Sequence, residues 1–228
     1  MTISPKPLFV LIDANALIHR SYHAIPPLSL ADGTPTNAAY GFTMTLLSAI
    51  KELKPTHIAA AFDLPVPTFR HQAYQPYKAH RQKADDELIA QFPLTKDILH
   101  SLNIPIFEQP GLEADDIIGI LSRQIATHHI PVIIVTGDMD SLQLIDRNTK
   151  VYTLKRGLKD TIIYNSKTVR ERYGFDPPQV IDYKALRGDP SDNIPGVKGI
   201  GDKTATTLIQ KYSSIDKLYN YLALHPDT

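Results

Sequence analysis

The chain of 228 residues carries 24 basic and 24 acidic side chains and no cysteine, and 43% of its residues are hydrophobic. Without cysteine, neither a disulfide framework nor a thiolate metal site can form, and the early apolar stretch at residues 8–12 is too short for a signal peptide or a membrane span. We therefore expect a cytoplasmic, monomeric globular protein with no membrane partner, built as one large domain or as a domain with a small appendage.

Apolar runs of strand length lie at residues 8–12, 57–62 and 131–135, and a weaker run lies at residues 104–108. Segments with helical spacing separate these runs, most clearly residues 37–53 and 114–126. Strands that are apolar on both faces and alternate with helices predict an α/β fold with a mostly parallel central sheet flanked by helices. Short helical patterns follow, so we expect an α/β core at residues 1–165 and a helical module at residues 166–228.

Acidic residues stand where the apolar runs end. Asp13, Asp63 and Asp138 end the three strong runs, and the sequence GLEADD at residues 111–116 follows the weaker one. Because ligands bind at the carboxyl ends of the strands in open α/β sheets, we expect these acids to share one edge of the sheet. With the acids of TGDMDS and GDPSDN, the expected cluster has nine members: Asp13, Asp63, Glu113, Asp115, Asp116, Asp138, Asp140, Asp189 and Asp192.

Each acidic motif also has a purely structural explanation. Acids in the first turn complement the helix dipole, so GLEADD could be a capped helix start, and Asp138 or Asp140 could cap the segment that follows TGDMDS. A lone aspartate after a strand is usually a turn residue. Together, however, such closely packed carboxylates would raise one another's pKa and destabilise the fold unless cations compensated them. Oxygen ligands without paired His or Cys favour Mg²⁺ or Mn²⁺, and nine carboxylates favour two metal positions.

The remaining surface is basic, because 15 acids against 24 bases are left once the nine clustered acids are set aside. Residues 64–93, which we call the basic arch, are expected to form a long mobile insertion above the sheet edge. Tyr74 and Tyr77 stand among its basic residues, which include Arg70, Lys78, Arg81 and Lys83. Such a run is usually a solvated face, but cations interleaved with aromatic rings also suit single-stranded nucleic acid.

The stretch IPGVKGIGDKTA at residues 194–205 places three glycines, Gly196, Gly199 and Gly201, ahead of a helix that Asp202 could cap. Glycines allow positive φ and close approach, and free amides at a helix start bind phosphate. The alternative is a plain turn between helices. We expect this glycine hairpin to form a phosphate-binding turn, together with three polar side chains: Lys198, Lys203 and Thr204.

These motifs together resemble the 5′ nuclease domain, a 5′ to 3′ exonuclease or flap endonuclease, of bacterial DNA polymerase I. The resemblance runs in order from about residue 8 to residue 222 through LIDANALIHRSYHA, AFD, FRHQAYQPYKAHR, GLEADD, TGDMDS and RGDPSDNIPGVKGIGDKTA. It implies a nuclease core like that of PIN domains, followed by a helix-hairpin-helix type module. It also implies an enzyme that cuts branched or 5′-flapped DNA during primer removal and repair, with a polymerase region as a covalent partner in the full-length protein.

The resemblance also implies roles for individual residues. Asp13, Asp63, Glu113, Asp115 and Asp116 would serve a first metal, and Asp138, Asp140, Asp189 and Asp192 a second. Lys78 and Arg81, with Arg70 nearby, would steer the scissile phosphate and stabilise its developing charge. The glycine hairpin would grip duplex backbone, often with a bound monovalent cation such as K⁺.

Two departures from the family pattern stand out. Met139 occupies the place where bacterial relatives usually carry a lysine, and the chain ends at Thr228, whereas the family's domain normally continues with further helices. We therefore expect either a fragment of a longer protein or an unusually short one.

Three other functions are weighed against this one. A PIN-type ribonuclease shares the acidic edge but needs neither the basic arch nor the glycine hairpin. A haloacid-dehalogenase-like phosphatase needs a DxD pair after the first strand, and here Asp13 is followed by Ala14 and Asn15. A non-catalytic DNA-binding module would tolerate loss of metal ligands, yet every expected carboxylate is present.

Overall fold

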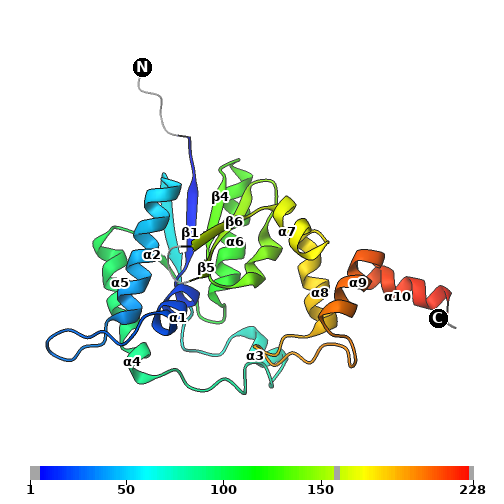
Figure 1. Ribbon diagram of the computed structural model, residues 1–228, viewed down its shortest axis with the longest axis horizontal. Helices are drawn as coiled ribbons and strands as arrows, with labels where there is room; N and C mark the ends of the chain where they lie inside the picture. The colour runs from blue at the N-terminus through cyan, green and yellow to red at the C-terminus, as the bar shows by residue number, and fades with distance from the viewer. Residues whose placement is uncertain (1–5, 157–159, 226–228) are drawn as a thin grey trace.

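In the computed structural model, which describes residues 6–156 and 160–225, one six-stranded sheet forms the centre of the molecule (Figure 1). The strands are β1 (Phe9–Asp13), β2 (His57–Ala61), β3 (Ile106–Phe107), β4 (Val132–Val135), β5 (Thr149–Arg156) and β6 (Asp160–Tyr164). Their order across the sheet is β3-β2-β1-β4-β5-β6, and every neighbouring pair is parallel except β5 and β6. The predicted mostly parallel sheet is confirmed.

Helices cover both faces of the sheet (Figure 1). One face packs against α1 (Ala14–Ala24), α2 (Asn37–Leu53) and α5 (Gln91–Ser101), and the other packs against α6 (Ala114–Thr127) and the 3₁₀ helix η1 (Met139–Leu144). Residues that alternate along β1 enter different cores: Leu11 joins the α6 side, and Ile12 joins the α1 side. This explains why β1 reads as a continuous apolar run.

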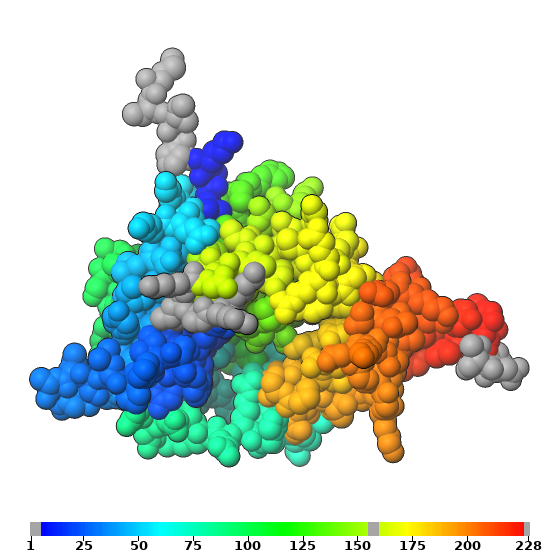
Figure 2. Space-filling view, viewed as in Figure 1, coloured from blue at the N-terminus to red at the C-terminus, as the bar shows by residue number. Residues whose placement is uncertain are grey.

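The second half of the chain adds helices to the α6 side. These are α7 (Ser166–Tyr173), the 3₁₀ helix η2 (Pro177–Gln179), α8 (Val180–Arg187), α9 (Asp202–Tyr212) and α10 (Ile215–Leu224). Ala205 and Ile209 of α9 and Leu218 of α10 belong to the same buried cluster as Leu11. The helices predicted after residue 165 are therefore present, and they extend the core of the α6 side. Figure 2 shows α9 and α10 projecting at one end of the molecule.

The apolar pattern of the sequence did not predict β5 and β6. β5 has the sequence TKVYTLKR, and its hairpin partner β6 lies at the edge of the sheet. Residues 151–154 of β5 are buried, but Thr153 interrupts their apolar run and Lys150 and Lys155 flank it, so the run is too short to predict a strand. Tyr152 of β5 is 1% exposed, and its hydroxyl donates to Glu52 Oε2 of α2 at 2.7 Å. This bond ties the hairpin to the helices on the α1 side of the sheet.

The basic arch is more ordered than the sequence suggested. It contains α3 (Phe69–Ala73) and α4 (Asp86–Ile89), and α5 already begins at Gln91. The arch runs beside the loop after α8, as Figure 2 shows, and backbone bonds join the two: Lys78 N donates to Asp192 O at 3.0 Å. The Asn193 side chain also donates to Pro76 O at 2.7 Å. These hydrogen bonds join the arch to the body in this conformation, and the mobility expected of the insertion stays a prediction.

Candidate active site

Four carboxylates at the carboxyl edge of the sheet have no basic partner among the described residues: Asp13, Asp63, Asp115 and Asp138. They come from the ends of β1, β2 and β4 and from the first turn of α6, and they line one cavity of about 220 Å³. The convergence expected from strand topology is therefore present. We call these four residues the unpaired carboxylates.

Local structure fixes three of the unpaired carboxylates. Asp13 caps α1, and its other oxygen accepts a hydrogen bond of 2.6 Å from the hydroxyl of Thr136. Asp138 caps η1 by accepting from the amide of Asp140 at 2.8 Å. Asp63 accepts from the amide of Ala114 at 2.6 Å, which fastens the end of β2 to the start of α6. Capping and clustering thus occur together in the same side chains.

Burial and mutual repulsion raise the proton affinity of this group. The pKa of Asp13, which is 4% exposed, rises to about 6 because burial outweighs its hydrogen bonds from Thr136 and Ala16. The pKa of Asp115 rises to about 8 because of burial and of the charges on Asp13 and Asp138. Asp115 accepts no hydrogen bond from any residue in the described part of the chain. These carboxyl groups therefore hold protons more readily than ordinary ones, because no basic side chain in the described part of the chain compensates their charge.

The other five carboxylates are held by basic side chains, and two of them lie at the start of α6. Asp116 accepts two hydrogen bonds from the Arg70 guanidinium, at 2.6 and 2.8 Å, and Glu113 contacts Lys78 Nζ at 2.9 Å. Burial alone would raise the pKa of Asp116, but the bonds from Arg70 outweigh it and lower that pKa. Glu113 is also the N-cap of α6, in a capping box with Asp116. The predicted capping role of GLEADD is confirmed.

Asp192 binds the arch from the opposite side. Its Oδ1 contacts Arg81 at 2.5 Å, and its Oδ2 accepts from the Tyr77 hydroxyl at 3.1 Å. That hydroxyl also lies 3.0 Å from Glu113 Oε2, and the ring is only 5% exposed. Burial and the two carboxylates raise the pKa of Tyr77. Tyr77 was expected to offer a stacking surface, but in this conformation it ties Glu113 to Asp192, because its hydroxyl is drawn between two acceptors.

Lys184 of α8 bridges the last two acids. Its Nζ contacts Asp189 Oδ2 at 2.7 Å and also pairs with Asp140. Burial lowers the pKa of Lys184, but the two carboxylates raise it by more, so the net change is an increase. The pKa of Asp140 is nevertheless raised, because burial and Asp138 outweigh the contribution of Lys184. Asp189, which also accepts from Ser191, has a lowered pKa because these bonds outweigh its burial. We call Glu113, Asp116, Asp140, Asp189 and Asp192 the paired carboxylates.

A divalent cation fits the donors around the cavity, although in this conformation they do not form a chelate. Within residues 6–156 and 160–225, no three His, Asp or Glu side chains converge closely enough to hold a metal ion. The unpaired carboxylates do not converge on one point, and the paired ones are engaged by lysine and arginine. The half-buried carboxylate of Asp115, which accepts no hydrogen bond within the described residues, is the observation that favours a hard cation, since carboxylate oxygens are what Mg²⁺ and Mn²⁺ bind.

The glycine hairpin lies beside this edge. Gly196 has a φ of +58°, and a Cβ there would stand 2.3 Å from the backbone nitrogen of Gly188. Gly196 is therefore needed for contact between two backbone segments, apart from any role toward a ligand. Gly199, with a φ of +85°, has open space around it. The remaining predicted contact residues are exposed: Lys198, Gly199, Gly201, Lys203 and Thr204. Gly201, not Asp202, is the N-cap of α9.

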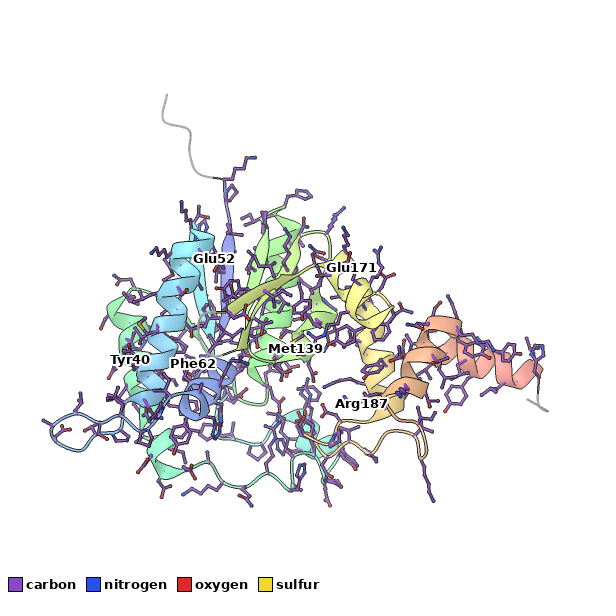
Figure 3. All side chains as sticks on the ribbon, in the orientation of Figure 1. Tyr40, Glu52, Phe62, Met139, Glu171 and Arg187 are labelled. Atoms are coloured by element: carbon purple, nitrogen blue, oxygen red, sulfur yellow. The ribbon has the colours of Figure 1, made fainter. Side chains whose placement is uncertain are left out.

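Sequence reasoning missed four polar residues of the site. Lys184 bridges Asp140 and Asp189, Thr136 orients Asp13, and two further side chains, Asn15 and His19, line the cavity. The Asn15 side chain accepts from the amide of Asp63 at 3.1 Å. Their sequence signals were weak, although Asn15 and Thr136 stand two residues from a clustered aspartate. Met139 lies on the side of the sheet that faces α8, where it lines a second cavity of about 510 Å³ (Figure 3).

An acidic edge on a mostly parallel sheet, faced by a basic arch and followed by a helical glycine hairpin, is an arrangement that suits a metal-dependent nuclease. A family model described as the N-terminal, resolvase-like domain of 5′-3′ exonucleases matches residues 8–174. A second, described as the C-terminal SAM fold of 5′-3′ exonucleases, matches residues 175–227. The chain belongs to the 5′-3′ exonuclease family.

Curated relatives agree with this assignment. The chain is 43% identical over 215 residues to DNA polymerase I of Caldicellulosiruptor bescii and 43% identical over 209 residues to DNA polymerase I of Bacillus subtilis. These alignments cover 93% and 92% of this chain but only 25% and 24% of the two relatives. The chain thus spans about a quarter of their length, and the suspected kinship with the 5′ nuclease domain of DNA polymerase I is confirmed.

Solved structures show the same fold. Bacteriophage T5 5′-exonuclease with bound divalent zinc ions superposes with a TM-score of 0.76 at 23% identity, over 94% of this chain and 79% of that one. The catalytic core of Rad2 in complex with a DNA substrate gives a TM-score of 0.61 at 16% identity, over 98% and 67%. At these identities the likeness concerns the fold. No helix in the described part of the chain is long and apolar enough to cross a membrane.

Proposed function

We propose that this chain is a divalent-metal-dependent 5′ nuclease that hydrolyses DNA phosphodiesters at 5′ ends and 5′ flaps, in primer removal and repair. The observation that carries the proposal is the group of unpaired carboxylates, with Asp115 at a pKa of about 8, directly facing cationic Lys78 and Arg81 across one cavity. An acidic centre needs metal ions to approach a polyanion, and the facing cations can receive its phosphate. Membership of the 5′-3′ exonuclease family supports the same chemistry.

Two Mg²⁺ or Mn²⁺ ions are the proposed cofactors. Asp13, Asp63 and Asp115, with the paired Glu113 and Asp116, would hold the first. Asp138, Asp140, Asp189 and Asp192 would hold the second. When bound, the ions supply an activated water and polarise the phosphodiester. The zinc-bound T5 5′-exonuclease structure supports divalent-cation binding by this fold.

The chain's own residues would position the phosphate and balance its charge. Lys78 and Arg81 reach the cavity from the arch while paired with Glu113 and Asp192. A phosphate entering the cavity offers these cations a new partner, and metal ions offer the released carboxylates one. Lys78 and Arg81, with Arg70 behind them, would then stabilise negative charge that develops on the phosphoryl oxygens. Exchange of partners on one set of side chains would thus couple DNA binding to metal binding.

The glycine hairpin is proposed to bind the duplex part of the substrate. Gly199, Gly201 and Thr204 present backbone amides and a hydroxyl at the start of α9, and Lys198 and Lys203 add positive charge. A K⁺ ion at the hairpin is part of this proposal, as are contact of Lys83 with the DNA, a monomeric state and a cytoplasmic location. The longer relatives are named DNA polymerase I, and we propose a covalently linked polymerase region in the full-length protein as the partner of this domain.

The test is cleavage of a labelled 5′-flap DNA beside a single-stranded RNA of the same sequence. We expect a short flap product that requires Mg²⁺, disappears with EDTA, and is lost in Asp138→Ala. Glu171→Gln, an exposed acid of α7, is the matched control and keeps full activity. Binding of the flap DNA without cutting would contradict the proposal and favour a non-catalytic module. Preferential cutting of the RNA would favour a PIN-type ribonuclease.

A further inference from the structure

A largely apolar slot of about 440 Å³ lies between α3 of the basic arch and α8, outside the acid cavity. Its walls come from Phe69, Ala73 and Tyr74 on one side and from Ile181 and Ala185 on the other. Phe69 is 49% exposed, and Ile181 is 57% exposed. Large apolar side chains gathered around a concave space mark a binding site more often than they mark ordinary surface.

The slot continues the acid cavity. Asp192 lines both spaces, and Tyr77, which lines the slot, donates its hydroxyl to Asp192 at 3.1 Å. A phosphate in the acid cavity would therefore have its neighbouring sugar and base close to the mouth of the slot. A ligand with an anionic group next to a flat, apolar group would fit the acid cavity with the first and the slot with the second.

The few polar groups of the slot suit a flat heteroaromatic ring. Gln143 stands at its wall, with its side-chain nitrogen donating to Asp140 O at 3.0 Å, so its side-chain oxygen can accept from a ligand edge. The guanidinium of Arg70 lies 4.6 Å from the centre of the Phe69 ring, which gives the slot a cation–π pair at its rim. Aromatic and guanidinium planes are the surfaces on which unpaired bases stack.

We propose that this slot takes one unpaired nucleobase of the strand being cut, adjacent to the scissile phosphodiester. The inference rests on the proposed function, since it needs a phosphodiester in the acid cavity, and it adds a base-binding subsite to that function. The slot recognises the face of a base by stacking and apolar contact, so it accepts all four bases and distinguishes a base from its absence. It therefore positions the strand without reading its sequence.

The experiment is single-turnover cleavage of 5′-flap DNA in which one nucleotide at a time, on either side of the cut, is replaced by an abasic analogue. At one of these positions we expect cleavage to slow by about tenfold, in line with the loss of one stacked base. All four natural bases at that position should be cut at similar rates. Equal rates for base-bearing and abasic flaps at every position would overturn the inference.

Filling the slot links that effect to these walls. Ala185→Phe places a ring in the slot from an exposed position on α8, and it should remove the difference between base-bearing and abasic flaps. Ala73→Leu fills the slot from α3 and should do the same. Circular dichroism checks the folding of both variants, and if one of them is misfolded, the other still tests the inference. Ala223→Phe, at an exposed position of α10, is the matched control and keeps the tenfold difference. Filled variants that still distinguish the two flaps would overturn the inference.

The outcomes separate this inference from the proposed function. If no flap is cut in Mg²⁺, the nuclease assignment fails, and the slot loses its basis with it. If flaps are cut but abasic substitution has no effect, the nuclease assignment stands and the slot is not a base site. Fluorescence of 2-aminopurine at the sensitive position gives an independent reading, because a stacked base is quenched. Quenching by the intact chain that disappears in Ala185→Phe supports the slot, and quenching that persists contradicts it.

Discussion

The unpaired and the paired carboxylates share one edge of the sheet but differ in what compensates their charge. Asp115 is half-buried among other acids and has a pKa of about 8, whereas Asp116, the next residue, is bonded twice to Arg70 and has a lowered pKa. Within the described residues, basic side chains compensate the paired group and leave the unpaired group without a cation. The unpaired carboxylates therefore lower the stability of the metal-free fold, whereas the paired carboxylates contribute to it.

The strongest test of this contrast replaces neighbouring acids. Asp115→Asn should lower the cleavage rate by about a thousandfold or more, because it removes a metal ligand from the centre of the cavity. It should also raise the stability of the metal-free protein by about 1–3 kcal/mol, since it relieves repulsion among buried acids. Asp116→Asn should instead destabilise the metal-free protein, because Arg70 loses its partner. Equal stability changes in the two variants, measured by urea unfolding in EDTA, would break the comparison.

The pH dependence of the metal-free protein should come from the unpaired group. Carboxyl groups whose folded pKa is raised stabilise the fold below their unfolded pKa of about 4 and lose that contribution as pH rises through the folded values. For Asp13 and Asp115 these values are about 6 and about 8. Stability in EDTA should therefore fall by about 5 kcal/mol from pH 5 to pH 9. Calorimetry with excess Mg²⁺ should show a much smaller fall, and an equally steep fall with Mg²⁺ would argue against metal binding by these acids.

Lys184 allows a paired site to be converted into an unpaired one. Lys184→Met keeps the length of the side chain but leaves Asp140 and Asp189 without their bridging cation. We expect the metal-free protein to lose about 1–3 kcal/mol and Mn²⁺ to restore most of that loss, because an ion can take the place of the ammonium group. Thermal unfolding with and without Mn²⁺ measures both effects. A variant that Mn²⁺ does not rescue would show that the bridge serves only the fold.

The smallest effect is expected at an exposed ion pair that does not line the cavity. Lys83 pairs with Asp86 at 2.7 Å, but the two side chains are 76% and 87% exposed. Lys83→Ala should therefore change stability by less than about 0.5 kcal/mol. If Lys83 contacts DNA, the variant should reduce the salt dependence of DNA binding by about one counterion. Fluorescence anisotropy at several salt concentrations checks this, and an unchanged slope would remove Lys83 from the DNA-binding surface.

The sequence predicted the elements whose apolar pattern is continuous and the acids that end them. The runs that became β1, β2 and β4 are buried on both faces, so each could be recognised locally, and strand topology then brings Asp13, Asp63 and Asp138 together. The division of these acids into two groups could not be predicted. It depends on Lys184, which has an ordinary helical neighbourhood and meets Asp140 only through the packing of α8 on η1.

The arch shows why a charged segment is hard to place from sequence. A run of basic and aromatic residues normally remains in water, and that expectation suited a free insertion. Here the excess acid at the sheet edge draws the run inward, and Tyr77 becomes one of the buried aromatic residues. The attraction between the basic arch and these acids outweighs the usual preference of such a segment for solvent. The local sequence pattern cannot show this, because the acids are distant in sequence.

The contact between Gly188 and Gly196 limits how this protein can vary. The backbone atoms of the two segments leave no room for a methyl group at either position, and each glycine also has a positive φ. A library of all single substitutions should therefore contain almost no functional members at these two positions, whereas Gly199, in open space, should accept asparagine. Lineages that change the reach of the hairpin must do so by insertion at its tip, since its base admits no side chain.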